Sequence, residues 1–591
     1  MKIFKLFNKT IDHKLFFSSF LVVMLAELAN TITCLIDGIL TGRFLGSEAM
    51  SAYGLASPYF SIAAIGSGIL TVSCQTLCTK ALSKGDRERA NQIFSTTIII
   101  AFCVSSLLAL SIILFPNSFC SLLGVRGESL VLLEETKRYL IPLGASCPLM
   151  VLIAVCIPIL QLDGAGRKAT ISSLVIAVVD IAFDLLNIFV LKWGILGMGL
   201  ASSLSYVGAI IVIINHFRSK DCYFKFSFKY FNKKDCAPII IDGLPRGIMR
   251  LCEGLGPIIL NIMIVSVIGV VGIEAIAIQR NVAFLVGTVG WGISGAIMQT
   301  TAIYYAERDV SGIKRMLNIA YGYNFIFGIG RTILVVILAP EIVSLYISQP
   351  GEINGIATTA VIVYALRVFF INFNFITSNY AQVIGRTGLA LFGNTASGFG
   401  YLIPLTYILG DQFGGDGFWV SFPTSEILVS ITLVIVMLAL NKGKIKDCNL
   451  MLKDGFAIDN DKRLSFTFTN STTSLEVSKM VQDFSSEAGV DDKKSFKLAL
   501  AVEEMIMSTI EHGFDDGKKH MIDVRISYDE EDIILRIRDD CALLDLKEKA
   551  KDWEENINDP MDNIGIRLVM GISKNVSYTN IMGTNNLLIV I

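Results

Sequence analysis

Of the acidic side chains that interrupt long apolar stretches of this 591-residue sequence, four are candidates for a functional role: Asp37, Asp180, Asp184 and Glu253. A carboxylate costs several kcal/mol in a hydrocarbon environment unless it is paired or hydrated. Asp180 and Asp184 are four residues apart, so on a helix they share one face. Because Asp37, Asp180 and Asp184 all fall in the first third of the sequence, we expect them to form a site that binds a proton or Na⁺.

Arginines also lie within or near the apolar stretches. Arg246 and Arg250 occupy the turns before Glu253, and Arg280, Arg331 and Arg367 follow. Acids and arginines on neighbouring helices can pair for purely structural reasons, which is the alternative to ion binding. We expect structural pairing mainly for the arginines and ion binding mainly for the acids.

The composition places these residues in a membrane. The chain is 53% hydrophobic and 17% charged, with a mean hydropathy of +0.60, whereas soluble domains carry about 25% charged residues. A helix needs about 20 mostly apolar residues to cross a bilayer. About twelve segments qualify: 15–40, 55–79, 93–115, 138–161, 169–191, 196–217, 238–266, 274–304, 317–339, 356–384, 389–410 and 416–440. The fold class is therefore an all-α membrane bundle, followed by a soluble α+β domain.

The charges between the apolar segments predict an orientation. Basic residues gather in alternate loops, for example at Arg87 and Arg89, at Arg167 and Lys168, and at Lys442 through Lys446. Such loops face the cytoplasm in most membrane proteins. With an even number of crossings, both termini are expected in the cytoplasm of a multi-pass plasma (inner) membrane protein. Residues 1–14 then form a cytoplasmic tail.

The membrane half repeats itself. Gly66-Ser-Gly-Ile with Gln75-Thr76 recurs as Gly290-Trp-Gly-Ile with Gln299-Thr300, and Gln161-Leu-Asp-Gly164 recurs as Gln382-Val-Ile-Gly385. A third pair is Trp193 to Gly197 with Phe413 to Gly417. The two parallel six-helix repeats favour a transporter with a cavity between two lobes. The predicted lobes are 15–217 and 238–440, joined by a cytoplasmic loop at 218–237.

Residues 15–440 resemble the multidrug and toxic compound extrusion (MATE) family. The resemblance rests on three segments. They are Asp37 to Pro58, Asp180 to Gly199, and Gly243-Leu-Pro-Arg-Gly247 followed by Glu253. It implies export of drugs or organic cations as small-molecule substrates, coupled to H⁺ or Na⁺ through Asp37, Asp180, Asp184 and Glu253. The family's helix 10 aspartate falls near Asn372 and Asn374, which are amides in this sequence.

The character of the sequence changes after residue 440. A basic linker at 441–460 precedes residues 461–591, which carry a net charge of about −9 from 25 acidic and 16 basic side chains. An acidic surface disfavours nucleic-acid binding. Strand patterns at 464–469, 522–528 and 532–538, helical patterns at 475–484, 496–512 and 564–574, and two final strands predict one α+β domain.

This soluble segment resembles the GHKL (Bergerat-type) ATP-binding fold, closest to the anti-sigma-factor serine kinases. Glu504 and Ser508 fall where that fold places a catalytic Glu and a Mg²⁺-holding Asn. Asp539 falls where an Asp binds adenine, and Gly565 falls in the phosphate-binding turn. Cys541 replaces an expected Gly, and the lid at 542–562 contains no Gly. The resemblance implies ATP and Mg²⁺ as ligands, with Ser508 as the metal-holding residue, while the changed motifs leave catalytic turnover open.

Three functions remain open from the sequence. The first is a cation-coupled exporter with an ATP-sensing regulatory domain that also docks a cytoplasmic protein partner. The second is a membrane-tethered anti-sigma-type serine kinase that uses the helical bundle as a sensor. The third is a lipid-linked sugar flippase. The intramembrane acids favour the first. Because no G-x-x-x-x-G-K-[ST] phosphate loop occurs, we do not expect the C-terminal domain to power transport, and coupling to an ion gradient is sufficient.

Overall fold

The computed structural model describes most of the chain. The described residues are 11–45, 47–83, 85–122, 130–219, 222–344, 352–453, 456, 462–469, 474–513, 520–529, 532–541, 564–581 and 584–591. Most of the predicted N-terminal tail and the whole predicted lid at 542–562 lie outside them.

The first half of the bundle, which we call the N-lobe, contains seven helices within the described residues. They are α2 (Ile11–Leu40), α3 (Ser47–Leu82), α4 (Arg87–Leu114), α5 (Pro116–Leu122), α6 (Leu130–Leu162), α7 (Gly166–Leu186) and α8 (Ile195–Phe217). All but the short α5 are long and apolar enough to span a bilayer. These six long helices correspond to the first six predicted segments.

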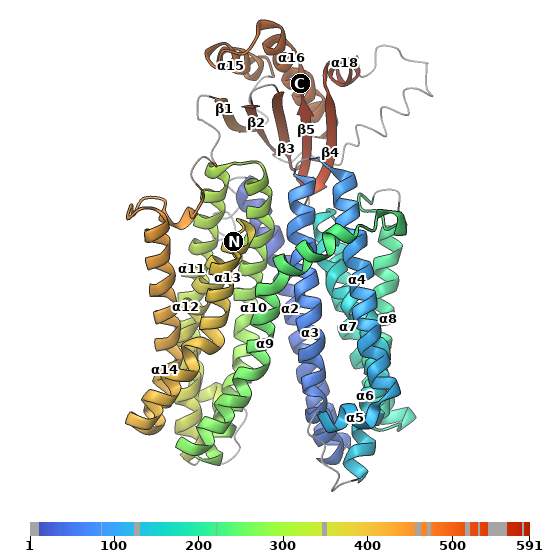
Figure 1. Ribbon diagram of the computed structural model, residues 1–591, viewed down its shortest axis with the longest axis vertical. Coiled ribbons are helices and arrows are strands. Elements are labelled where there is room, and N and C mark those ends of the chain that lie inside the picture. Colours follow the sequence, from blue (N-terminus) through green and yellow to red (C-terminus); the bar gives the residue numbers. More distant parts are fainter. Residues whose placement is uncertain are drawn as a thin grey trace.

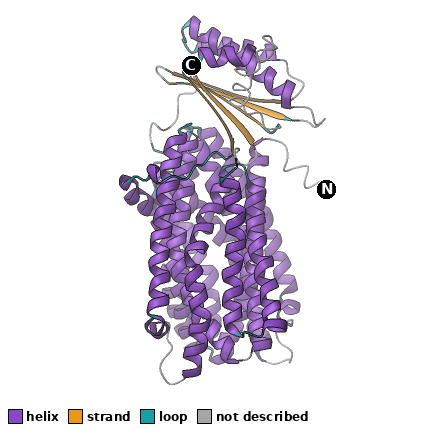
Figure 2. Ribbon diagram, turned by 90° about the vertical axis from the view of Figure 1, so that its right-hand side faces the viewer, coloured by secondary structure: helices purple, strands orange, loops and turns teal. Residues whose placement is uncertain are grey.

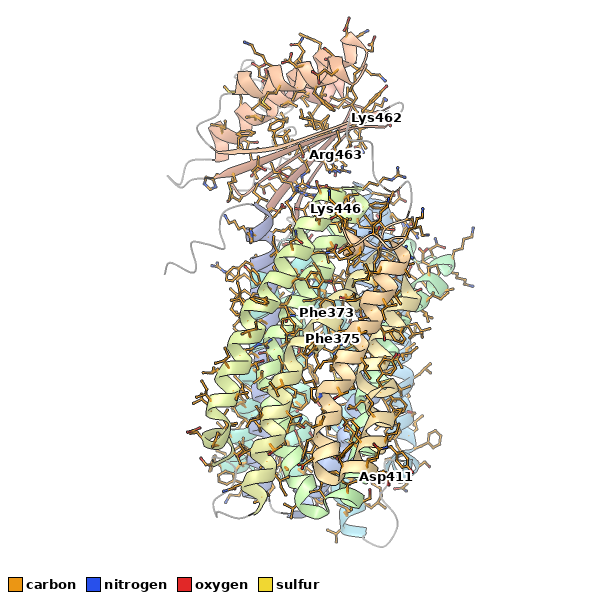
Figure 3. The ribbon with its side chains drawn as sticks, turned by 90° about the vertical axis from the view of Figure 1, so that its left-hand side faces the viewer. Phe373, Phe375, Asp411, Lys446, Lys462 and Arg463 are labelled. Carbon is orange, nitrogen blue, oxygen red and sulfur yellow. The ribbon has the colours of Figure 1, made fainter. Side chains whose placement is uncertain are left out.

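The second half, the C-lobe, follows the same plan (Figure 1). Its helices are α9 (Cys236–Val267), α10 (Val270–Ala306), α11 (Val310–Ser344), α12 (Glu352–Val383), α13 (Thr387–Thr395) and α14 (Leu402–Leu440). The stretch Thr387–Leu440 is 54 residues long and turns at Gly414, whose φ is 60°. Figure 3 places Asp411 at the far end of the bundle and Lys446 at the end near the soluble domain, as two crossings require. The two predicted segments 389–410 and 416–440 meet at this turn.

Two pairs of helices make the most extensive contacts between the lobes. α2 packs on α10, and α3 packs on α9. Phe16 and Phe20 of α2 lie in one apolar cluster with Ile293 and Tyr323 of the C-lobe. Gln299 Nε2 donates a hydrogen bond to Gln161 Oε1 at 2.5 Å across the same junction. Two glutamines, one from each of two repeated sequence motifs, thus join the two lobes.

The soluble domain is one antiparallel sheet covered on one face by helices (Figures 1 and 2). The strands β1 (Arg463–Thr469), β2 (Met521–Asp529), β3 (Asp532–Asp539), β4 (Asn575–Ile581) and β5 (Thr584–Val590) lie in the order β1-β2-β3-β5-β4. The covering helices are α15 (Ser474–Glu487), α16 (Asp492–Gly513) and α18 (Ile564–Ile572).

Alternation along the strands separates the two faces of this sheet. In β2, Ile522, Val524 and Ile526 belong to the core under the helices, while the intervening residues face the opposite way, because successive side chains in a strand alternate. The β2–β3 hairpin pairs Ile526 with Leu535, which sets two core residues side by side. The predicted strands are therefore confirmed, and their alternation separates a core face from a second face that the helices leave uncovered.

Candidate functional site

The three N-lobe acids come together between α2 and α7, which pack side by side. Asp37, Asp180 and Asp184 are only 8%, 4% and 1% exposed. The carboxyl of Asp37 lies next to those of both other acids. The structure therefore assembles the predicted cluster from two separate helices.

Asp180 has a hydrogen-bond partner in Ser202, but four of the six oxygens of these carboxyls lack a donor of the kind that buried acids usually have. Among the described residues, no hydrogen-bond donor reaches Asp37 Oδ1, Asp180 Oδ1, or either carboxylate oxygen of Asp184. A buried polar atom without a partner costs free energy, so native proteins rarely retain one without a use. Three such groups within one cluster can accept a proton or provide hard oxygen ligands for Na⁺.

A tight corner after α7 fixes the position of Asp184. Asn187 Nδ2 donates to the carbonyl of Gly194 at 2.8 Å, and Asn187 Oδ1 accepts from the Trp193 backbone N–H at 3.1 Å. Gly197 leaves room for this amide, because a Cβ there would lie 1.9 Å from Asn187 Oδ1. The Trp193 to Gly197 segment thus positions an acid one turn away.

The fourth predicted acid, Glu253, lies on α9 in the C-lobe. Its side chain falls outside the described residues, so the structure does not place it with the other three acids. On the same helix, the Cγ atoms of Arg246 and Arg250 lie against Gly68 of α3, each 3.4 Å from the position that a Cβ would occupy there.

The C-lobe contains a buried acid that the sequence prediction missed. Glu426 of α14 is fully buried. Arg367 Nη2 lies 2.7 Å from Glu426 Oε1, and Asn374 Nδ2 donates to Glu426 Oε2 at 2.8 Å. Ser397 Oγ donates to the same carboxylate at 2.8 Å. A lone Glu in the apolar segment 416–440 was the signal that could have found it.

Asn372 and Asn374, the amides in place of the family's helix 10 acid, occupy different surroundings. Asn374 belongs to the Glu426 network. Asn372 Oδ1 lies against Gly290, where a Cβ would approach it to 2.1 Å. Gly290 of the repeated Gly-x-Gly-Ile motif is therefore required by a close approach of helices α10 and α12.

In the soluble domain, three elements bring the predicted nucleotide residues together. Glu504 and Ser508 lie one turn apart on α16, Asp539 ends β3, and Gly565 is in the first turn of α18. Helix α16 packs against both α18 and β3. The elements that must surround a nucleotide are thus adjacent, and the predicted lid lies outside the described residues.

Asp539 is held in a fixed orientation. Its Oδ1 accepts hydrogen bonds from Asn585 Nδ2 at 2.7 Å and from the Cys541 backbone N–H at 3.0 Å. Burial raises the pKa of Asp539 above the usual aspartate range, and these two donors offset part of that effect. The hydroxyl of Ser508 is also buried. Glu504 lies one turn before Ser508 on the same helix.

The comparisons with known proteins agree with this architecture. The MatE family profile matches residues 23–186 and 245–408, which repeats one profile over both lobes. A second profile, histidine kinase-like ATPase domain, matches residues 468–591. The chain belongs to the MATE family of multidrug efflux transporters and carries a C-terminal histidine kinase-like ATPase domain. Such domains generally bind ATP.

Individual relatives cover the membrane part. The multidrug export protein MepA of Staphylococcus aureus (strain NCTC 8325 / PS 47) is 22% identical over 445 residues, covering 71% of this chain and 93% of the relative. MepA of Staphylococcus saprophyticus is 21% identical over 414 residues, covering 69% and 90%.

Solved structures share the fold of the bundle. An outward-facing multidrug resistance MATE transporter of the MOP superfamily aligns with a TM-score of 0.68 and 20% identity, over 73% of this chain and 96% of that one. A MOP superfamily transporter from Pyrococcus furiosus aligns with a TM-score of 0.67 and 20% identity, over 72% and 94%.

Proposed function

We propose that this transporter exports drugs or organic cations by exchange with H⁺ or Na⁺, and that Asp37, Asp180 and Asp184 bind the coupling ion. The observation that carries this proposal is the group of neighbouring, buried carboxyls, four of whose oxygens no described donor reaches. Occupation of the cluster by a cation neutralises charges that would otherwise repel one another in a medium of low dielectric constant. Loss of the cation destabilises the arrangement of α2 against α7, which gives a route from ion release to helix movement.

The orientation follows from the loops that lie beside the soluble domain. Three arginines at the ends of membrane helices lie near that domain or its linker. Arg87 begins α4, just after Gly85, which lies against β5. The backbone carbonyl of Arg308 accepts from Arg463, and Arg386 donates to the carbonyl of Met451. This end carries the basic loops, so by the positive-inside rule it faces the cytoplasm of the plasma membrane. Both termini and the ATPase-type domain are then cytoplasmic.

A cellular efflux assay with a fluorescent organic cation tests the coupling role. Asp184→Asn and Asp37→Asn should each reduce efflux to the level of cells without the transporter, while the protein remains at normal abundance in the membrane. Glu134→Gln is the matched control, since Glu134 is an exposed acid of α6 that pairs with Lys137 on the same helix. Full efflux by both aspartate variants would refute the assignment of the cluster.

We further propose that the cytoplasmic domain binds ATP with Mg²⁺ and regulates transport. Asp539 would accept a hydrogen bond from the adenine amino group, and Gly565 at the start of α18 would offer backbone N–H groups to phosphate. Ser508 would hold Mg²⁺, which screens the phosphate charge when bound, and Glu504 would occupy the position of the fold's catalytic Glu. The short Ser508 side chain replaces the amide expected for turnover, so we propose binding in a sensing role, with a cytoplasmic protein as a further partner.

The residue after Asp539 connects this pocket to the transporter. Asp540 Oδ1 accepts from the Met521 backbone N–H at 2.9 Å, and Asp540 Oδ2 lies 2.5 Å from Lys14 Nζ at the start of α2. Helix α2 also carries Asp37. A ligand that moves the end of β3 can therefore act on a helix of the ion-binding cluster.

Calorimetry of the full-length protein with ATP and Mg²⁺ tests the nucleotide assignment. We expect binding by the wild type and an affinity at least about tenfold weaker in Asp539→Asn, a loss of about 1.4 kcal/mol. Asp532→Asn, which changes an exposed acid of the same strand, serves as the control and should bind normally. Absence of binding by the wild type at millimolar ATP would contradict the assignment.

A further inference from the structure

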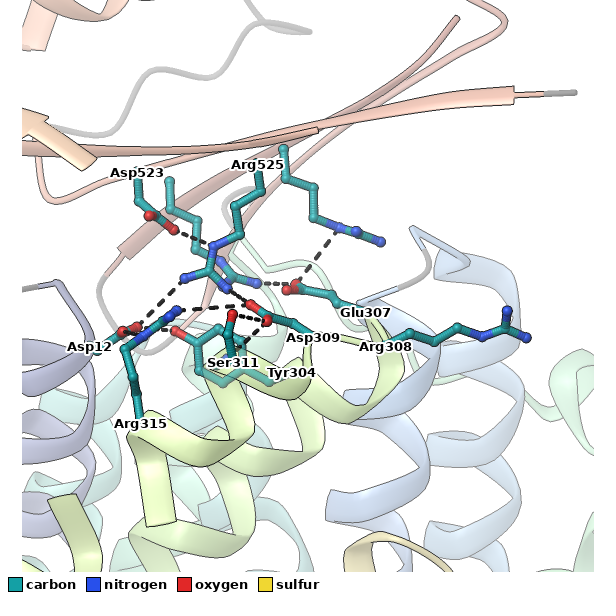
Figure 4. Close-up of polar contacts among 12 residues, drawn as sticks. Asp12, Tyr304, Glu307, Arg308, Asp309, Ser311, Arg315, Asp523 and Arg525 are labelled. Atoms are coloured by element: carbon teal, nitrogen blue, oxygen red, sulfur yellow. Dashed lines mark hydrogen bonds and ion pairs between the residues drawn. The ribbon is translucent and has the colours of Figure 1, made fainter. Parts of the chain in front are cut away.

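The sheet face opposite the helices carries four arginines: Arg463, Arg525, Arg536 and Arg538. They come from β1, β2 and β3, where they alternate with core residues. Arg525, Arg536 and Arg538 are all buried although they lie on the face without helices. What buries them is the end of the membrane bundle (Figure 4). We call this surface the arginine face.

In the C-lobe, the arginine face meets the short loop between α10 and α11. Arg538 pairs with Glu307, and Arg525 pairs with Asp309. Arg463 Nη2 lies 2.9 Å from Asp309 Oδ2 as well. Burial by itself would raise the pKa of Asp309, yet Arg525 and Arg463 lower it to about 2. Asp309 is therefore held ionised between guanidinium groups.

The same sheet also rests on the N-lobe. Arg536 Nη2 donates to the carbonyl of Ser83 at 3.4 Å, just after α3 ends. Two residues further along the chain, Gly85 lies against β5, because a Cβ at Gly85 would lie 2.9 Å from Leu588 Cδ2. Lys14 of α2 adds its contact with Asp540. One rigid sheet thus touches both lobes at the same end of the bundle.

Asp12 occupies the place where all three parts meet. It lies at the start of α2 in the N-lobe, but its partners are in the C-lobe: Arg315 Nε is 2.5 Å from Asp12 Oδ2, and the Tyr304 hydroxyl donates to Oδ1. Arg525 Nη2 of the sheet lies 3.8 Å from the same carboxylate. Arg525 is therefore placed between an N-lobe acid and the C-lobe acid Asp309, as Figure 4 shows.

We infer that the docked arginine face is a clamp that holds the cytoplasmic ends of the two lobes together. This inference rests on the orientation given under Proposed function. Inward opening requires α2 and α3 to separate from α10 and α9, and a sheet bonded to both sides opposes that movement. Separation would expose or unpair charges that the docked state buries and neutralises, which is unfavourable. The cytoplasmic domain, in this position, inhibits inward opening.

Double electron–electron resonance on the full-length protein in nanodiscs tests the clamp. Spin labels at Arg167→Cys in the N-lobe and Lys444→Cys after α14, with the exposed Cys103 changed to Ser, report the separation of the lobes at the domain end. Wild type should show one short distance. Glu307→Gln with Asp309→Asn removes the C-lobe acids and should add a longer distance in at least a third of the molecules.

Two further variants make the result specific. Lys574→Gln breaks the exposed Lys574–Asp532 pair of the same domain and should keep the short distance. Exchange of charges, Glu307→Arg with Arg538→Glu, should keep it as well. An unchanged distance in Glu307→Gln/Asp309→Asn, or a long distance in the exchanged pair, would overturn the clamp. The measurement needs no substrate or ion gradient, so a failure of ion coupling leaves its outcome unaffected.

Discussion

In the N-lobe, Asp37, Asp180 and Asp184 lie buried beside one another, and no described donor reaches four of their carboxylate oxygens. In the C-lobe, Glu426 is buried just as deeply, yet Arg367, Asn374 and Ser397 satisfy its carboxylate. The two lobes share a repeat and a helical framework, so the difference lies in local partners. A satisfied acid can hold helices together, whereas an unsatisfied group of acids needs a cation.

The largest effect on stability is expected where an acid has a fixed partner. Glu426→Gln leaves the Arg367 guanidinium buried without its counter-charge, which should cost about 3–5 kcal/mol. Thermal unfolding of the purified transporter, with the membrane abundance in cells, measures this loss. Changing Glu426 and Arg367 together to Met should recover most of it. A stable Glu426→Gln protein would mean that the pair does not hold α12 and α14 together.

A smaller effect is expected at Asp309, which is paired across the boundary between the transporter and the domain. Its pKa is lowered from 3.8 to about 2, so ionised Asp309 contributes about 2 kcal/mol above pH 4. The sign follows from the lowered pKa: the contribution is present at neutral pH and is lost as pH falls from about 4 towards 2. The melting difference between wild type and Asp309→Asn should shrink over that range. A pH-independent difference would contradict the ion pairing.

The smallest effect on stability is expected for the N-lobe cluster, although its effect on transport is the greatest. Asp184→Asn removes a carboxyl whose neighbours in the cluster are the two other acids, so folding should lose nothing measurable and can gain. The melting temperature of Asp184→Asn should equal or exceed that of the wild type. A clear decrease would show that Asp184 has a structural partner like that of Glu426, and the contrast between the lobes would disappear.

Much of the fold could be predicted from the sequence, because its causes are local. Apolar runs of bilayer length defined the helices, repeated motifs defined the two lobes, and alternation in 522–528 and 532–538 defined the central hairpin. The grouping of Asp180 with Asp184 followed from helical spacing. Their position beside Asp37 depends on the packing of α2 against α7, and the sequence indicated it only through their place in one repeat and the resemblance to the family.

Long-range partners could not be predicted. Glu426 finds Arg367 and Asn374 from positions more than fifty residues away, and nothing local to 426 specifies them. The alternation in β2 and β3 placed Arg525, Arg536 and Arg538 on one face, but a polar strand face usually meets water. That Glu307 and Asp309 cover this face depends on how the domain sits on the bundle.

Substrate-driven ion flux in proteoliposomes tests the central claim most directly. With an outward substrate gradient and no membrane potential, the wild type should move H⁺ or Na⁺ in the opposite direction, and a pH dye and a Na⁺ dye identify which ion it is. Asp184→Asn should show no counterflow of either ion, whereas Glu134→Gln should match the wild type. Undiminished counterflow by Asp184→Asn and Asp37→Asn would show that the N-lobe acids do not couple transport to an ion.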